Sequence, residues 1–141
     1  MGADIHILVE HWDGGAWSAI ENPSYSKEKS EWRRWEWGAP RSYGVFDALA
    51  GVRAQGPVPR NFPRGLPGDM SEQAKDLLEG FCHSTSAMSA TEFCRILTQG
   101  GEDEGPLVGY NGELTFHGVI KGIRALPWPM REVRVLFGFD S

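Results

Sequence analysis

The sequence predicts an α+β fold: an antiparallel sheet with about three helices on one face, joined by long ordered loops. Residues 4–11 and 133–140 alternate between apolar and polar side chains, which is typical of strands. In the middle of the chain, capping residues precede apolar side chains at helical spacing. A length of 141 residues fits a single domain, 1–141, with a core that needs no disulfides.

A hairpin opens the predicted sheet. Residues 4–11 form its first strand, because apolar side chains occupy every second position. Asp13-Gly14-Gly15 is a turn signal, and residues 16–20 can return antiparallel to the first strand. Residues 133–140 alternate in the same way and predict a C-terminal strand.

Three segments carry helix signals. Ser42 can cap a helix over residues 43–52. A second helix is expected between Asp69 and Gly80, and a third from Ser89 to about Thr98, because each begins with a capping residue and a glutamate three residues on. Residues 114–124 show strand-like spacing at their start and helical spacing later, so the sequence leaves their structure open.

Loops separate these elements. Residues 53–68 hold so many prolines and glycines that no regular element can form, yet their apolar side chains predict an ordered loop. Residues 81–86 are polar and too few for an element of their own. Residues 101–113 are acidic and rich in glycine, so we expect a solvated surface loop.

Charge and composition exclude several classes of protein. The 14 Lys and Arg residues against 19 Asp and Glu leave a net charge of −5, which argues against a stable grip on duplex nucleic acid. No apolar run approaches the ~20 residues of a membrane span, and the N-terminus lacks a signal-peptide pattern. The two cysteines form no CxxC pair. We therefore expect a cytoplasmic protein with no membrane partner.

One candidate site lies on the first strand. Asp4 and His6 are two residues apart, so their side chains leave the same face of a strand with Cα atoms about 7 Å apart. Asp4 can orient the imidazole of His6 for general acid–base chemistry, or both can ligate a metal ion. A solvent-facing pair without a chemical role is the alternative.

A second candidate site is the run His83-Ser84-Thr85-Ser86. It places a proton-transfer group beside hydroxyls that can donate to phosphate oxygens. A serine-rich connector that caps the third helix explains the same residues. We expect no cofactor. A divalent metal, if one binds, would need Asp4, His6 and His83 assembled across the fold, because no Cys or His spacing matches a zinc site.

Aromatic and basic residues suggest how a ligand could be held. Residues 31–37 interleave tryptophans with arginines, and they either lie over the core or form a wall on which a base stacks. Arg41 and Arg64 belong to a local concentration of arginines around the proline-rich loop. Their guanidinium groups could form bidentate hydrogen bonds with a phosphate while Tyr43 or a tryptophan stacks on the base.

Several motifs together resemble a family of small proteins from tailed phages and prophages. They are Met1-Gly2-x-Asp4-Ile5-His6, Arg41-Ser42-Tyr43, Pro63-Arg64-Gly65-Leu66-Pro67, His83-Ser84-x-Ser86 and the alternating run 133–140. The stretch before His83 departs from that family, in which an acidic residue closely precedes the histidine. The resemblance implies an accessory factor that acts on host physiology, a class that includes proteins that sequester or destroy nucleotide immune signals.

These observations predict a counter-defence protein that binds and hydrolyses a cyclic or signalling nucleotide. His6, oriented by Asp4, and His83 are the expected catalytic pair, and the expected ligand-binding residues are Arg41, Tyr43, Arg64, Ser84 and Ser86. A sponge that holds the nucleotide unchanged is one alternative. An inhibitor that binds a host protein through the tryptophans of residues 31–37 is another, and a minor virion component is a third. A homo-oligomer is compatible with all of these.

Overall fold

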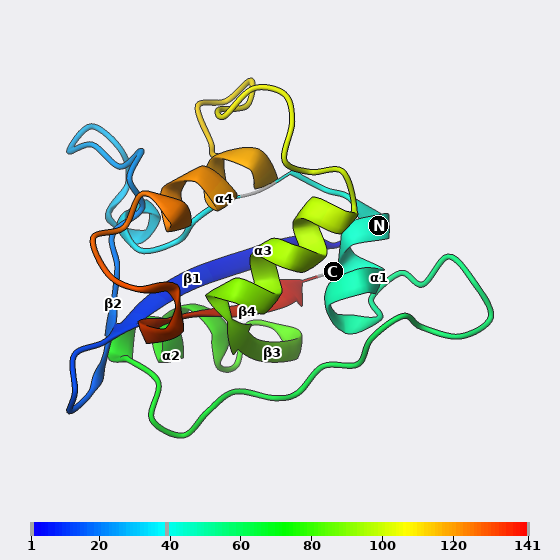
Figure 1. Cartoon of the computed structure of the whole chain (residues 1–141), viewed down its shortest axis with the longest axis horizontal. Coiled ribbons are helices and arrows are strands. Elements are labelled where there is room, and N and C mark those ends of the chain that lie inside the picture. Colours follow the sequence, from blue (N-terminus) through cyan, green and yellow to red (C-terminus); the bar gives the residue numbers. More distant parts are fainter. Residues whose placement is uncertain (1, 39, 141) are drawn as a thin grey trace.

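The computed structural model describes residues 2–38 and 40–140, so Met1 of the N-terminal motif lies outside the described residues. Its centre is one antiparallel sheet in the strand order β2-β1-β4-β3 (Figure 1). The strands are β1 (Asp4–Trp12), β2 (Trp17–Ala19), β3 (His83–Ser89) and β4 (Val133–Asp140). The predicted α+β class, the N-terminal hairpin and the C-terminal strand are confirmed, and β1 and β4 pair along the middle of the sheet.

Three helices cover one face of this sheet, and they are α1 (Tyr43–Ala50), α3 (Ala90–Gln99) and α4 (Phe116–Arg124). Ile5, Ile7 and Val9 of β1 face them and are buried together with Phe137 and Phe139 of β4. The large apolar core of the protein therefore lies between the sheet and these helices.

Helix caps follow the expected residues. The Ser42 hydroxyl accepts a hydrogen bond from the Val45 N–H, and the Ser89 hydroxyl accepts one from the Glu92 N–H. The segment that the sequence left open is helical, because Thr115 caps α4 and the apolar side chains that follow are buried. Burial against the sheet decides between two spacings that are both present in the sequence.

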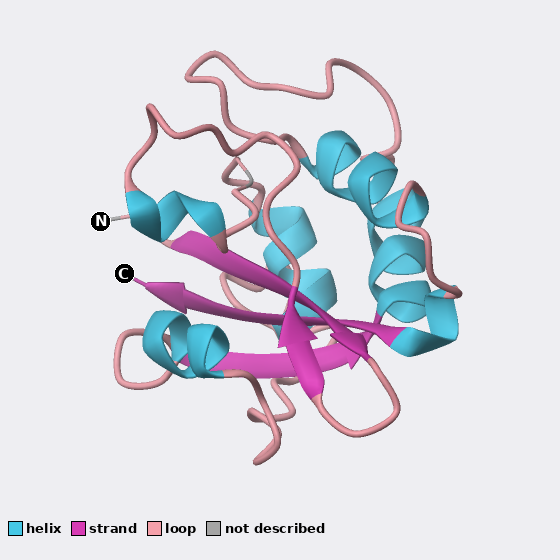
Figure 2. Cartoon of the chain, turned by 90° about the vertical axis from the view of Figure 1, so that its left-hand side faces the viewer, coloured by secondary structure: helices cyan, strands magenta, loops and turns pink. Residues whose placement is uncertain are grey.

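The helix α2 (Glu72–Leu78) differs from the other helices because it packs on the opposite face of the sheet, so helices lie on both sides (Figure 2). Leu8 and Leu136 are buried beneath it by Ala74 and Leu78. The second predicted helix therefore does not join the other two on one face. Its N-cap is Ser71, which leaves Asp69 outside the helix.

A buried carboxylate ties α2 to the sheet. Glu10 of β1 is fully buried, and its Oε2 accepts a hydrogen bond from the Ser71 N–H at 2.7 Å. Its Oε1 accepts one from Nε of Arg134 at 2.7 Å. The same arginine reaches Asp69 at 3.1 Å. This network holds the start of α2 at a defined place over β1 and β4.

The expectation that residues 81–86 are too short for an element is wrong, because residues 83–86 open the edge strand β3. Pairing with β4 provides hydrogen bonds that no local pattern encodes. The strand begins with a bulge between His83 and Ser86, where Ser84 has φ of 51°. The proline-rich loop partly covers this edge, since the Gly65 N–H donates to the Thr85 carbonyl at 2.9 Å. Among the described residues, no helix is both long enough and apolar enough to span a bilayer.

Candidate functional site

Two adjoining hollows lie along β1 and share the side chains of His6, Trp32 and Glu36. The segment 31–38 forms part of both. Trp37 fixes this segment to the edge of β1. Its backbone N–H donates to the Ile7 carbonyl at 2.8 Å, and its indole ring is completely buried. Because Trp37 anchors this segment in the core, the preceding residues are held over the other face of the strand.

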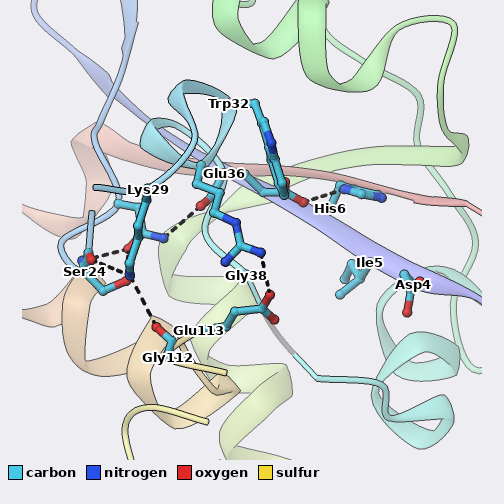
Figure 3. Close-up of a pocket in the computed structure, with 12 residues that line it drawn as sticks. Asp4, Ile5, His6, Ser24, Lys29, Trp32, Glu36, Gly38, Gly112 and Glu113 are labelled. Atoms are coloured by element: carbon cyan, nitrogen blue, oxygen red, sulfur yellow. Dashed lines mark hydrogen bonds and ion pairs between the residues drawn. The ribbon is translucent and has the colours of Figure 1, made fainter. Parts of the chain in front are cut away.

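The first hollow, here called the polar hollow, has a volume of about 260 Å³. It lies between β1, the segment 22–38 and residues 112–113, as Figure 3 shows. Nζ of Lys29 donates to the carbonyls of Ser24 at 2.8 Å and Gly112 at 3.4 Å. Nη2 of Arg33 lies 3.5 Å from Oε1 of Glu113. Two cationic side chains thus face the same small space.

His6 stands between two carboxylates at the junction of the hollows. Its Nδ1 bonds to Glu36 Oε1, and its Nε2 bonds to Asp140 Oδ2 at 2.5 Å (Figure 3 shows the Glu36 bond). Hydrogen bonding to Glu36, and then to Asp140, raises the pKa of His6 to about 9 despite its partial burial. The side chain is therefore an imidazolium at neutral pH, with both N–H groups donated to carboxylates.

Glu36 provides a buried acceptor at the same junction. The residue is 8% exposed, and its Oε1 bonds to His6. Its other oxygen, Oε2, is buried and has no hydrogen-bond partner among the described residues. A buried carboxylate oxygen without a partner is costly, so it favours a ligand group that donates a hydrogen bond there.

The second hollow, here called the aromatic groove, has a volume of about 670 Å³ and lies between α2 and the segment 31–36. Its apolar lining comes from Trp32, Trp35, Leu77 and Phe81. Phe81 is 80% exposed and Trp32 is 58% exposed, so much of this apolar surface meets solvent. Carboxylates stand around it, and they belong to Glu31, Glu72 and Asp76.

The structure changes the role expected for Asp4. Its carboxylate does not orient His6 but pairs with Nε of Arg41 at 2.7 Å, and this hydrogen bond lowers the pKa of Asp4. Glu36 and Asp140 hold the imidazole instead. The reason is tertiary, because one partner comes from a distant loop and the other from the neighbouring strand β4. Arg41 does lie close to the site, bound to one of its lining residues.

The expected pairing of His6 with His83 is not formed within the chain. His83 pairs across the sheet with Phe139, whose side chain faces the core, whereas His6 pairs with Gly138. Neighbouring positions on a strand project to opposite faces, so the two imidazoles leave opposite sides of the sheet. His83 is therefore also separated from Asp4 and His6, the other two expected metal ligands, and no metal-binding cluster occurs among residues 2–38 and 40–140.

The remaining predicted ligand residues have structural partners. Arg64 forms two hydrogen bonds with the carboxylate of Glu92, at 2.8 and 2.6 Å. Ser86 is fully buried, and its hydroxyl accepts a hydrogen bond from the backbone N–H of Arg64. The Tyr43 hydroxyl accepts one from the Ala3 N–H, and the Ser84 hydroxyl bonds to Nδ1 of His83. None of these four predicted residues lines either hollow.

Sequence reasoning missed Lys29, Glu36 and Asp140. The signals that pointed to this region were the Asp4 and His6 pair and the tryptophan-rich run, which contains Glu36. The structure separates the tryptophans of that run: Trp37 lies in the core, whereas Trp32 is exposed, with the guanidinium of Arg33 5.0 Å from its ring centre. Stacking of a base on this run stays a prediction. No family model, curated protein or solved structure gives a significant match to this chain.

Proposed function

We propose that this protein binds a small nucleotide at the polar hollow and holds it unchanged. The observation that carries the proposal is the convergence of three cationic side chains beside an exposed indole, formed by His6, Lys29, Arg33 and Trp32. A nucleotide combines an anionic phosphate with a flat base, and these groups match cations and an indole face respectively.

The charge of Lys29 supports an anionic group at this place. The polar hollow is lined by the three cations and by three carboxylates, Asp4, Glu36 and Glu113. Each of these carboxylates already has a cationic partner. No carboxylate of the described residues lies within ion-pair distance of Lys29. Its ammonium group donates to two carbonyls, so its charge is not neutralised and its third N–H can bind a phosphate. In a protein of net charge −5, such a place is distinctive.

The shape suggests how the ligand would lie. A hollow of about 260 Å³ is slightly smaller than the range for ligand pockets, about 300–1,000 Å³, which favours one phosphate-bearing unit over a large dinucleotide. The base would stack on Trp32, because aromatic stacking is worth about 1–3 kcal/mol per base. The free oxygen of Glu36 would accept a hydrogen bond from a hydroxyl or amino group of the ligand.

Sequestration rather than hydrolysis is favoured by the state of the histidines. A general base needs a free nitrogen, and both nitrogens of His6 are bound to carboxylates. His83 belongs to the opposite face of the sheet. The proposal therefore adopts the sponge among the alternatives from the sequence. A role in removing a host signalling nucleotide remains a prediction from the phage-family resemblance.

Calorimetric titration with a panel of mononucleotides and cyclic nucleotides tests this proposal. We expect binding of at least one nucleotide, and chromatography after denaturation should return it intact. Lys29→Met should weaken that binding about tenfold, because it removes a charge-assisted contact. Lys27→Met is the matched control, since Lys27 is exposed and lines neither hollow.

Three outcomes would contradict the proposal. They are absence of binding across the panel, equal binding by the Lys29 and Lys27 variants, and recovery of a cleaved nucleotide. The last result would reinstate catalysis, and its dependence on His83 would show whether a second chain completes the site.

A further inference from the structure

We propose that the aromatic groove is a docking site for a basic, apolar segment of another protein. The groove lies beside the polar hollow but has different chemistry, because apolar rings form its floor and carboxylates form its rim. This inference does not rest on nucleotide binding. Trp32 lines both hollows, but Phe81 and the carboxylates of Glu72 and Asp76 line the aromatic groove and not the polar hollow.

The rim carries negative charge that the protein neutralises only in part. Glu31 lies 3.4 Å from Arg34, and Glu72 lies 3.9 Å from Lys75, with both carboxylates largely exposed. Asp76 has no cation within ion-pair distance among the residues that the structure describes. Of the residues that the structure describes, His6 is the one cationic side chain that lines the groove, and Glu36 and Asp140 already bind it. The rim therefore repels anions and attracts a basic partner.

The floor is suited to side chains that are both apolar and cationic. Phe81 and Trp32 expose large rings beside Trp35 and Leu77, and such patches commonly mark interaction sites. Tryptophan faces attract guanidinium groups, and Arg34 already lies 4.8 Å from the ring centre of Trp35. An arginine of a partner could use the open surface of Trp32 in the same way.

The walls of the groove are held in place before any partner binds. Glu10 ties the N-cap of α2 to the sheet, and Leu78 buries the inner side of the helix. Trp37 anchors the opposite wall in the core. A preformed groove loses little entropy on binding, which favours recognition of a short segment. The occupant is thus a partner chain that presents arginine or lysine together with apolar side chains.

Fluorescence anisotropy with synthetic peptides tests the inference. The probe is a labelled peptide that alternates arginine with leucine, and the controls alternate glutamate with leucine or arginine with serine. We expect the arginine–leucine peptide to bind at least about tenfold more tightly than either control, and its affinity to fall with added salt.

Variants locate the binding. Glu72→Gln combined with Asp76→Asn should lower the affinity for the arginine–leucine peptide about tenfold, and so should Phe81→Ala. Asp103→Asn combined with Glu104→Gln removes the same charge from a distant loop and should leave the affinity unchanged. All of these side chains are exposed or half-buried and none is in the core, so unchanged melting temperatures would exclude misfolding.

Several results would overturn the inference. They are equal binding of the acidic peptide, an undiminished affinity in the Glu72 and Asp76 double variant, tighter binding of an oligonucleotide than of the peptide, and self-association that blocks the groove. Lys29→Met separates the two proposals, because it should weaken nucleotide binding and leave peptide binding intact. The nucleotide and peptide measurements can therefore contradict either proposal without contradicting the other.

Discussion

The two faces of the sheet are built from the same strands but differ in how completely helices cover them. On the face covered by α1, α3 and α4, alternate side chains of β1 and β4 are enclosed in one large apolar core. On the other face, the short α2 covers only Leu8, Leu136 and their neighbours, while His6 remains at the border of two hollows. Incomplete coverage of one face therefore creates the space in which a ligand can bind.

The largest effect should come from opening the helix-covered face. Phe137 is completely buried and its ring packs against those of Phe93 and Phe139. Phe137→Ala should lower the free energy of unfolding by about 3–5 kcal/mol, because it leaves a cavity in the main core. Urea denaturation measures this loss. A loss smaller than that of Leu136→Ala on the other face would contradict the ranking of the two faces.

A somewhat smaller loss is expected at the buried ion pair behind α2. Glu10→Gln removes the negative charge that neutralises the largely buried Arg134 guanidinium, so the free energy of unfolding should fall by about 3 kcal/mol. Hydrogen exchange should show α2 opening before α3. Asp69→Asn removes the exposed partner of the same arginine and serves as the control, with an expected change of less than about 1 kcal/mol.

The next effect is a pH dependence that originates at His6. The pKa of His6 is raised to about 9 in the folded protein from an ordinary value of 6.5, so the folded state binds the proton more tightly than the unfolded state. Its stabilisation is complete below pH 6.5 and is lost as the pH rises through 9. We expect the free energy of unfolding, measured by urea denaturation at each pH, to fall by about 2 kcal/mol between pH 6.5 and 9.

His6→Gln is the matched variant for this measurement, because it keeps a hydrogen-bonding side chain and removes the titration. Its stability should be nearly independent of pH between 6.5 and 9. An equally steep decline in the variant would assign the pH dependence to another group.

The smallest effect on stability is expected at the wall between the hollows. Trp32→Ala should change the free energy of unfolding by less than about 0.5 kcal/mol, because the side chain is 58% exposed. The same change should weaken both nucleotide and peptide binding, since Trp32 lines both hollows. A variant that binds both ligands as tightly as the native protein would remove Trp32 from both sites.

Local patterns predicted most of the elements because their causes are local. The turn at Asp13-Gly14-Gly15, the caps at Ser42 and Ser89 and the alternation in residues 133–140 depend on near neighbours in the chain. The strand β3 escaped prediction because its polar residues gain their partners from β4. Residues 114–124 stayed ambiguous until burial against the sheet selected a helix.

The site was predictable only in part for the same reason. His6 and the tryptophan-rich run could be recognised from residue type, and both border the hollows. The partners of His6 could not, because Glu36 and Asp140 lie 30 and 134 residues away from it. His83 and Arg64 looked equally suitable, yet strand register and the pairing with Glu92 direct them elsewhere.

The amino-acid sequence by itself determined the strand and helix segments with local signals, and it determined which residues have side chains capable of binding or proton transfer. The tertiary structure alone decided which of them meet. The spacing of apolar residues and helix capping depend on residues a few positions apart. The charge state of His6 and the two hollows arise instead from groups that only the folded chain brings together.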